Sequence, residues 1–271
     1  MTESEAKNVN EAGEKAKQQP AAGIPKIIHQ IQIGEINKPL SAKVIEWINR
    51  TKAVNQDYEH RLWSSKQELE SFVNEKYPHI LLAYKMLPFD IQRYDLVRLL
   101  ILYEFGGVYI DTDVECFQPF DVLLQNKKVC FALEPDTHAS DFENFPYMLG
   151  TFFIATEPQN EFIKYLIDGI LGGIFEKHST HNPTQIMKST GPAKVTELHR
   201  KAQGHFPVSL IPSKFLSPLN QSQINDYLRG KYFSEIEGAF MIHLYAGAWV
   251  DSSENKLDIE LKKELRRRLG I

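Results

Sequence analysis

The chain has 271 residues, of which 42% are hydrophobic and 11% aromatic, so it can bury a sizeable core and is not a wholly disordered protein. It carries 31 Lys and Arg against 35 Asp and Glu, and the net charge of −4 is opposite in sign to that of most nucleic-acid-binding domains. No apolar run approaches the roughly 18 residues of a membrane-spanning helix, and the first residues lack a signal-peptide pattern. The two cysteines, Cys116 and Cys130, fit a reducing compartment. We therefore expect a cytoplasmic protein without a nucleic-acid partner.

The order of elements follows from polarity and hydrophobic periodicity. Residues 1–23 are polar and predict a disordered tail, whereas residues 24–271 predict a single domain. Alternating or β-branched apolar runs predict strands at 26–33, 58–63, 108–110, 129–133, 151–155, 208–211 and 240–244. Helical periodicity and end signals predict helices at 41–55, 65–76, 90–105, 161–170 and 193–202, with a short helical piece between Pro78 and Pro88. Alternating strands and helices indicate an α/β sheet with helices on its faces, which binds ligands where its strands end.

Two local signals mark where helices begin and end. Ser65 and Glu68 have the spacing of a capping box at the start of the second helix. Gly106 and Gly107 end the helix at 90–105 in the manner of a left-handed cap, and they lead directly into the strand at 108–110.

The sharpest chemical signal is Asp111-Thr112-Asp113, directly after the strand at 108–110. Two carboxylates that leave a strand end together can turn toward one hard cation, and oxygen ligands suit Mg²⁺ or Mn²⁺ with substrate phosphates in the remaining positions. Most isolated pairs of this kind are merely solvated loop carboxylates. The position after an apolar strand favours a metal site here.

A second signal lies on the helix that leads into this strand. Asp95 and Arg98 are three residues apart and share one helix face. Spacing alone favours a surface ion pair of little energetic value. Because the helix ends next to the strand that carries Asp111, we instead expect both side chains to face the same cleft, where they can meet a phosphate or sugar hydroxyls.

The string from Asp95-x-x-Arg98 through Gly106-Gly107 to Asp111-Thr112-Asp113 resembles the sugar-binding region, with its DXD motif, of family 32 glycosyltransferases. A similar block occurs in the large clostridial glucosylating toxins. Further blocks in family order, which extend the resemblance over roughly residues 24–250, are the first strand from Ile24, Leu62-Trp63, 190–192, His243 and 247–249. The blocks are specific in combination, although none is specific by itself.

This resemblance implies a GT-A fold, a Rossmann-like and mostly parallel mixed sheet flanked by helices. It implies that Asp111 and Asp113, with His243, hold Mn²⁺ or Mg²⁺ against the diphosphate of a nucleotide-sugar. The donor-binding set that it implies, by strand, helix and loop, is Ile31, Gln32, Asp95, Arg98, Asp111, Thr112, Asp113 and Trp249. Within that set Asp95 and Arg98 contact the donor sugar, the strand from Ile28 to Gln32 lines the base, and Trp249 closes a loop over the donor. The residues expected to carry catalysis are Asp95, Arg98 and Asp113.

The implied activity is that of a retaining glycosyltransferase. Such an enzyme moves a hexose from a UDP- or GDP-sugar to a glycan, lipid-linked or protein acceptor, and the leaving phosphate helps to deprotonate the acceptor on the same face. Three positions depart from the family pattern: Gln32 replaces a common Trp, Gly150 lies where Asn is frequent, and Ala248 replaces a common Ser. These departures leave the donor preference open.

Two other functions remain possible at this stage. Asp-x-Asp after an apolar strand is also the first motif of haloacid-dehalogenase-type phosphohydrolases, although the acidic pair that such enzymes need later in the chain is missing. A non-catalytic carbohydrate-binding protein on a degenerate transferase fold would explain the three departures.

Three weaker features complete the predictions. His29 is expected to be a satisfied core histidine, and Glu115 either lies near the metal or has a structural role. Residues 257–269 space leucines four apart beside Lys and Arg, which predicts a basic amphipathic helix. Such a helix is compatible with peripheral contact at the inner face of a membrane, although packing on the protein body is the commoner role.

Overall fold

The computed structural model describes residues 23–33, 41–140, 145–173, 183–202, 204–231 and 233–246. The predicted tail at 1–22, Trp249 and the predicted helix at 257–269 lie outside these residues. Among the described residues, none of the helices has the length and apolar character needed to cross a bilayer.

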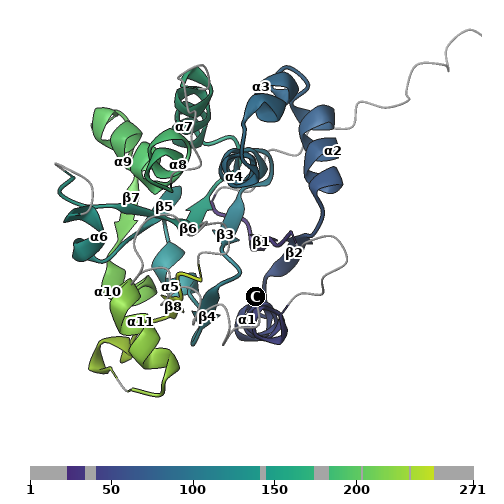
Figure 1. Cartoon of the computed structure of the whole chain (residues 1–271). Coiled ribbons are helices and arrows are strands. Elements are labelled where there is room, and N and C mark those ends of the chain that lie inside the picture. Colours follow the sequence, from purple (N-terminus) through teal and green to yellow (C-terminus); the bar gives the residue numbers. More distant parts are fainter. Residues whose placement is uncertain are drawn as a thin grey trace, which may run out of the picture.

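A six-stranded mixed sheet forms the centre of the molecule (Figure 1). Its strands in spatial order are β2 (Glu59–Trp63), β1 (Ile27–Ile31), β3 (Gly107–Ile110), β6 (Leu149–Thr156), β5 (Val129–Leu133) and β7 (Ser209–Ile211). Strand β1 is parallel to β2 and β3, and β5 is parallel to β7, whereas β6 is antiparallel to both of its neighbours. The prediction of a mixed and mostly parallel sheet is thus confirmed. Because β1, β3 and β5 run in one direction, their carboxyl ends lie at the same edge of the sheet.

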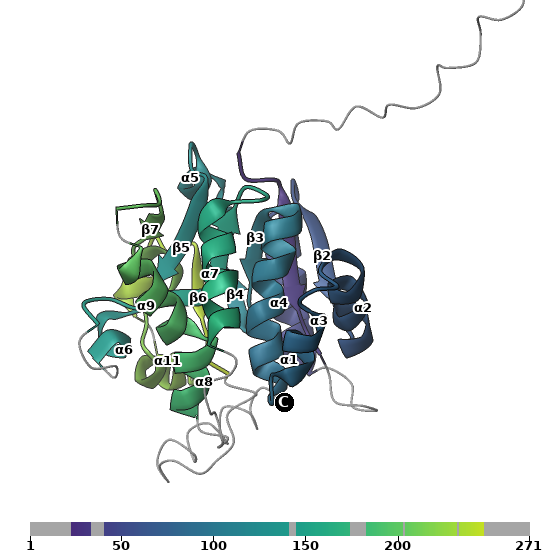
Figure 2. The same cartoon turned by 90° about the horizontal axis from the view of Figure 1, so that it is seen from above.

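Helices cover one face of the sheet and bury the larger core (Figures 1 and 2). The helices on this face are α2 (Lys66–Lys76), α3 (Leu81–Met86), α4 (Asp90–Phe105), α7 (Glu161–Gly172), α8 (Pro183–Ser189) and α9 (Pro192–Lys201). Helices α4 and α7 lie side by side across the sheet, as Figure 2 shows. Every residue of α4 from Leu96 to Leu102 is buried, because this helix packs on the strands with one side and on neighbouring helices with another. Helix α4 is therefore fixed firmly behind the end of β3.

The opposite face carries a small second sheet and shorter helices. Strands β4 (Val114–Cys116) and β8 (Met241–His243) pair antiparallel, with Val114 opposite His243. Around them lie α1 (Ala42–Val54), α5 (Asp121–Leu124), α10 (Ser213–Leu216), α11 (Gln221–Leu228) and the 3₁₀ turn η1 (Ser234–Ile236), while α6 (Asp136–Ser140) lies beyond the end of β5. The sequence did not predict β4 or the helices of four to eight residues around it, because such short elements offer too few positions for a period to show.

The start of α2 and the corner before β3 show how local sequence sets these elements. Ser65 Oγ accepts the N–H of Glu68 at 3.0 Å, as a capping residue should. The Glu68 carboxylate reaches the N–H of Ser64 rather than that of Ser65, so the predicted capping box is shifted by one residue on its return bond. At the corner, Gly106 and Gly107 have φ of 64° and 92°.

The corner glycines also permit a close approach between strands. A Cβ on Gly107 would lie 2.5 Å from the carbonyl oxygen of Ile27 in β1. Only glycine, therefore, lets β3 start in register beside β1, and this register determines where the residues after Ile110 emerge.

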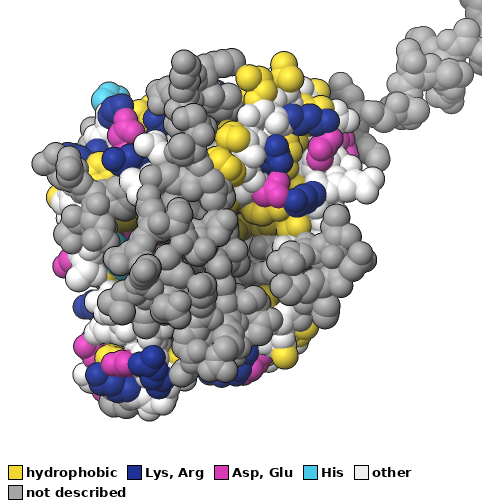
Figure 3. All heavy atoms as spheres, viewed as in Figure 1, with side chains coloured by type: hydrophobic (Ala, Val, Ile, Leu, Met, Phe, Trp, Pro, Cys, Tyr) yellow, Lys and Arg dark blue, Asp and Glu magenta, His cyan; other side chains and the backbone are white. Residues whose placement is uncertain are grey.

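The surface mixes charges of both signs with a small apolar area over α3. Leu82 and Met86, four residues apart on α3, expose 72% and 49% of their surface. Figure 3 shows hydrophobic atoms gathered over this helix, with Lys, Arg, Asp and Glu interspersed nearby.

Candidate active site

The Asp-x-Asp motif is the crossing between the two sheets. The chain leaves the large sheet at Ile110 and enters the small one at Val114, so residues 111–113 span the gap. The N–H of Asp111 donates to the carbonyl of Phe152 at 2.9 Å, which extends the pairing of β3 with β6 by one bond. The carbonyl of Asp113 accepts the N–H of Leu244 at 2.9 Å, just after β8. Both ends of the motif are therefore held by strands.

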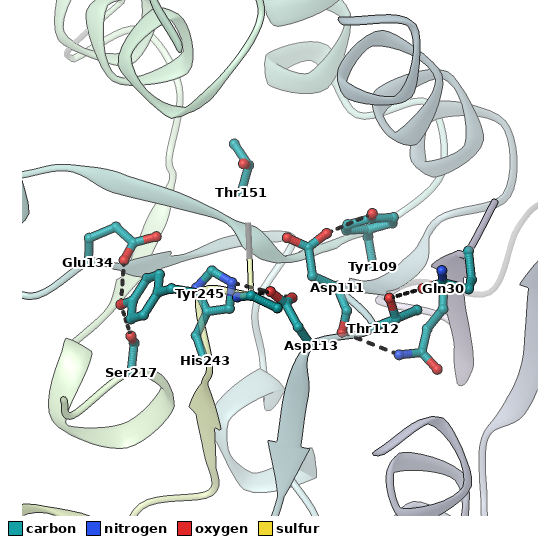
Figure 4. A network of polar contacts seen from close by, with 12 residues as sticks. Gln30, Tyr109, Asp111, Thr112, Asp113, Glu134, Thr151, Ser217, His243 and Tyr245 are labelled. Carbon is teal, nitrogen blue, oxygen red and sulfur yellow. Dashed lines mark hydrogen bonds and ion pairs between the residues drawn. The ribbon is translucent and has the colours of Figure 1, made fainter. Parts of the chain in front are cut away.

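Asp111, Asp113 and His243 converge at this crossing (Figure 4). One potential ligand atom from each lies within 4.8 Å of the others, and no second group of this kind occurs in the part of the chain that the structure describes. His243 Nε2 is 3.5 Å from Asp113 Oδ1, while His243 Nδ1 is buried without a hydrogen-bond partner. Two carboxylates favour a hard divalent cation, and an added imidazole suits Mn²⁺ better than Mg²⁺, which prefers oxygen. The structure thus brings together the three residues predicted as metal ligands, in a donor set that fits a divalent ion.

Arg98 lies behind Asp111 and is almost fully buried, with 5% of its surface exposed. Its Nη2 is 2.8 Å from Asp95 Oδ1, and its Nη1 is 3.5 Å from Asp111 Oδ1 and donates to the carbonyl of Thr151 at 3.0 Å. The guanidinium carbon also lies 4.7 Å from the centre of the Tyr109 ring. The alternative of an exposed ion pair is therefore wrong. A buried, fully engaged guanidinium orients Asp111, because it can satisfy several acceptors at once in a fixed geometry.

Asp95 is held on its other side by the segment before α9. The hydroxyl of Thr190 donates to Asp95 Oδ2 at 2.8 Å, and both residues are buried. Burial raises the pKa of Asp95, against the attraction of Arg98 and the hydrogen bond from Thr190. The predicted contact of Asp95 and Arg98 with a donor sugar stays a prediction, and each of the two residues exposes 5% of its surface.

The two carboxylates of the motif have different environments. Burial raises the pKa of Asp111, and neighbouring Asp113 adds to this rise, although Arg98 and the hydroxyl of Tyr109, which donates at 2.8 Å, oppose it. For Asp113, burial also acts upward, but His243 and the N–H of Ala246, 2.9 Å from Oδ2, prevail and lower its pKa. A cation between the two carboxylates would stabilise the charged form of both.

The end of β1 borders the motif on the side predicted to hold the nucleotide base. The hydroxyl of Thr112 donates to Gln32 Oε1, and Gln30 Nε2 donates to the carbonyl of Asp111 at 3.3 Å. His60 Nε2 lies 2.7 Å from Gln30 Oε1, which ties β2 to the same network. The side chain of Ile31 is buried in the larger core, so only its backbone is available to a donor. The base contacts of Ile31, Gln32 and Thr112 stay predictions.

Sequence reasoning missed a polar group on the other side of His243. Glu134 follows the end of β5, at the same sheet edge as Asp111, and is 8% exposed. The hydroxyl of Tyr245 donates to Glu134 Oε2 at 2.9 Å and contacts Ser217 Oγ at 2.5 Å. A carboxylate just past an apolar strand was the available signal for Glu134. The signal for Tyr245 and Ser217 was absent, because they come from separate parts of the chain.

His29 and Glu115 both have structural contacts. His29 is fully buried, contacts the carbonyl of Gly106 through Nε2 at 3.1 Å and accepts the Trp63 indole N–H at 3.5 Å, which confirms a core histidine. Glu115 lies 3.5 Å from Arg50 Nη1 and accepts the hydroxyl of Tyr227 at 3.1 Å, so its contacts link α1, β4 and α11 and its role is structural.

Part of the chain matches a known family, and curated proteins are similar to a larger part of it. Residues 41–130 match the family described as glycosyltransferase sugar-binding region containing DXD motif. Inositol phosphoceramide mannosyltransferase 1 of Schizosaccharomyces pombe is 30% identical over 192 residues, which are 70% of this chain and 56% of that protein. An initiation-specific alpha-1,6-mannosyltransferase of the same yeast is 22% identical over 260 residues, which are 85% of this chain and 65% of that protein. The chain thus spans little more than half of the curated relative to which it is 30% identical.

A solved structure gives the fold. PaToxG Glycosyltransferase superposes with a TM-score of 0.51 at 17% identity, covering 92% of this chain and 86% of that chain. Asp95, Arg98, Asp111 and Asp113 all lie within the matched family region, so the phosphohydrolase alternative is not adopted. The chain has the GT-A fold, and its residues 41–130 match the glycosyltransferase sugar-binding region that contains the DXD motif.

Proposed function

We propose that the chain is a metal-dependent, retaining glycosyltransferase that moves mannose from a nucleoside-diphosphate donor to an inositol-containing glycolipid. The observation that carries this proposal is the convergence of Asp111, Asp113 and His243 at the sheet edge, backed by buried Arg98. Mannose is the sugar proposed because several relatives are named mannosyltransferases. The acceptor follows from relatives named for inositol phosphoceramide.

The proposed chemistry assigns separate tasks to the chain's own residues. Asp111, Asp113 and His243 would hold Mn²⁺, which neutralises charge on the donor diphosphate as it leaves. Arg98 keeps Asp111 oriented, since it contacts Asp111, Asp95 and the backbone of β6 at once. Asp95 and Arg98 each expose 5% of their surface, and through this exposed part they are proposed to meet donor sugar hydroxyls.

Retention of the anomeric configuration is proposed to occur on one face of the sugar. Glu134, the carboxylate outside the motif that Figure 4 labels, is engaged by the hydroxyl of Tyr245 and by His138 Nδ1 at 3.2 Å, so it is not assigned as a nucleophile. The leaving phosphate oxygen instead takes the acceptor proton, while the bond from the anomeric carbon to that oxygen breaks and the bond to the acceptor oxygen forms.

The test is a thermal-shift screen of UDP- and GDP-sugars with and without Mn²⁺, followed by a turnover assay. A ligand that binds only the native state raises the melting temperature. We expect a Mn²⁺-dependent shift with a mannose donor, release of nucleoside diphosphate with inositol phosphoceramide present, and an axial product linkage by NMR. Affinity without turnover for any donor would instead support the non-catalytic carbohydrate binder.

A further inference from the structure

Tyr245, the residue after Leu244 beyond β8, has an unusual backbone. Its φ is 47°, in the left-handed region that residues other than glycine rarely adopt. A conformation of this kind persists only where the surroundings determine it, and such residues cluster at functional sites. Here the contacts of the Tyr245 side chain hold the backbone in this conformation.

The Tyr245 hydroxyl is held by two elements of the body. It donates to Glu134 Oε2, at the end of β5, at 2.9 Å. It also lies 2.5 Å from the hydroxyl oxygen of Ser217, which caps the end of α10. Figure 4 shows the three side chains in line, with the Tyr245 ring between Glu134 and His243. The ring is thereby fixed at its far end, away from the motif.

The turn at Tyr245 places backbone and ring groups on Asp113. The residue before it donates an N–H to the Asp113 carbonyl, and the residue after it, Ala246, donates its N–H to Asp113 Oδ2, both at 2.9 Å. The rings of Tyr245 and His243 have centroids 4.2 Å apart. The left-handed residue thus lies between two hydrogen bonds that end on one aspartate.

The other face of His243 is supported by Phe152 of β6. The two rings stack with centroids 4.5 Å apart and an angle of 21°. A Cβ at position 150 would lie 2.5 Å from Phe152 Cε1, so glycine at this position leaves the space that the Phe152 ring occupies. Gly150, noted in the sequence as a departure from the family pattern, is therefore required by the packing that holds His243.

We propose that Tyr245 is a positioning residue for the metal centre. Its hydroxyl, anchored on Glu134 and Ser217, stabilises the turn that directs the Ala246 N–H and the His243 ring onto Asp113. The metal-binding consequence rests on the proposed function, whereas the effect on the turn does not. The effect on the turn can therefore be measured in metal-free buffer, separately from metal binding.

The experiment compares Tyr245→Phe with Tyr227→Phe. Each variant removes only a tyrosine hydroxyl that donates to a glutamate on another part of the fold. The difference is that Tyr227 donates to Glu115, a residue outside the group of Asp111, Asp113 and His243. Amide hydrogen exchange of Ala246, followed by NMR without metal, reports the turn. Calorimetric titration with Mn²⁺ alone reports the centre. We expect Tyr245→Phe to speed exchange at Ala246 and weaken Mn²⁺ binding, each by roughly tenfold, as for a lost hydrogen bond to a charged group, with the control unchanged.

Variants of Glu134 add a second arm. Glu134→Gln keeps an oxygen that accepts from Tyr245 and should preserve slow exchange at Ala246, whereas Glu134→Ala should behave like Tyr245→Phe. Unchanged exchange at Ala246 in Tyr245→Phe would overturn the positioning role. If the parent protein binds no Mn²⁺ while exchange still rises in the variant, the positioning role holds and the proposed metal-dependent function fails.

Discussion

At the scale of single residues, the two aspartates of the motif are equivalent in sequence but not in surroundings. Asp111 faces a guanidinium and a tyrosine hydroxyl, whereas Asp113 faces an imidazole and a backbone N–H. Their pKa values are accordingly moved in opposite directions, upward for Asp111 and downward for Asp113. Two nearby carboxylates in such a site favour binding of a cation over binding of two protons.

Asp111→Asn and Asp113→Asn should each lower donor turnover by about 100-fold or more while the protein stays folded. Asparagine preserves size but removes the negative charge that a divalent ion requires, and electrostatic groups of this kind contribute factors of about 10²–10³. Turnover with Mn²⁺ and the melting temperature without metal are the measurements. Asp57→Asn, at a side chain that is 82% exposed, is the control. Normal turnover in both motif variants would exclude the metal site.

His29 makes a prediction about pH. Burial lowers the pKa of His29 from its usual value of 6.5 to about 4, so the folded protein keeps it neutral. Between these values the unfolded chain binds a proton that the folded chain does not. The free energy of unfolding should therefore fall as the pH drops from about 6.5 to about 4, by up to about 1.4 kcal/mol per pH unit from this residue.

Urea denaturation at several pH values checks the His29 prediction. The His29→Gln variant should lose this part of the pH dependence, whereas His79→Gln, at an exposed position, should keep it. Equal pH dependence in the parent and His29→Gln would contradict the role given to burial.

At the scale of elements, the corner between α4 and β3 aligns the helix that carries Arg98 with the strand that leads to Asp111. Gly107→Ala should lower the free energy of unfolding by ~2 kcal/mol or more, because φ is 92° and the new Cβ would meet the Ile27 carbonyl oxygen at 2.5 Å. Gly172→Ala in α7, where the new Cβ would meet no described atom beyond the helix's own backbone within 4 Å, should be neutral or stabilising by up to about 1 kcal/mol. Chemical denaturation of both variants tests the contrast, and similar values for the two would remove the steric argument.

At the scale of the whole molecule, the site joins distant parts of the chain. Asp111 and His243 are 132 positions apart and meet only because β4 pairs with β8. The unfolded chain therefore has no such site, and metal binding should stabilise the folded state alone. At Mn²⁺ concentrations of about 100 times the dissociation constant, the free energy of unfolding should rise by ~2.7 kcal/mol. Urea denaturation in Mn²⁺ and in chelator measures this, and a gain of the same size in Asp113→Asn would show that the ion binds elsewhere.

Much of the fold could be predicted from local pattern. The long helix Asp90–Phe105 was predicted with the bounds observed, because an apolar period and two glycines mark it clearly. Strands β3 and β5 were predicted within one residue, since each is a short apolar run between polar or glycine signals. Strand β4 was missed, because three residues after a charged motif carry no period, and its identity as a strand depends on its partner β8.

What the sequence determined by itself is the family resemblance, the helix and strand order, and the identity of Asp111, Asp113 and His243 as residues to be brought together. Only the tertiary structure decided how they are supported. The spacing of Asp95 and Arg98 alone was compatible with a surface ion pair. In the structure Arg98 is buried, because α4 packs against β6 and removes the guanidinium from water. Glu134, Ser217 and Tyr245 became neighbours because β5, α10 and the end of β8 meet at one edge. Contacts between residues far apart in the chain leave no local pattern, so their energies, and the site they shape, are set only when the chain folds.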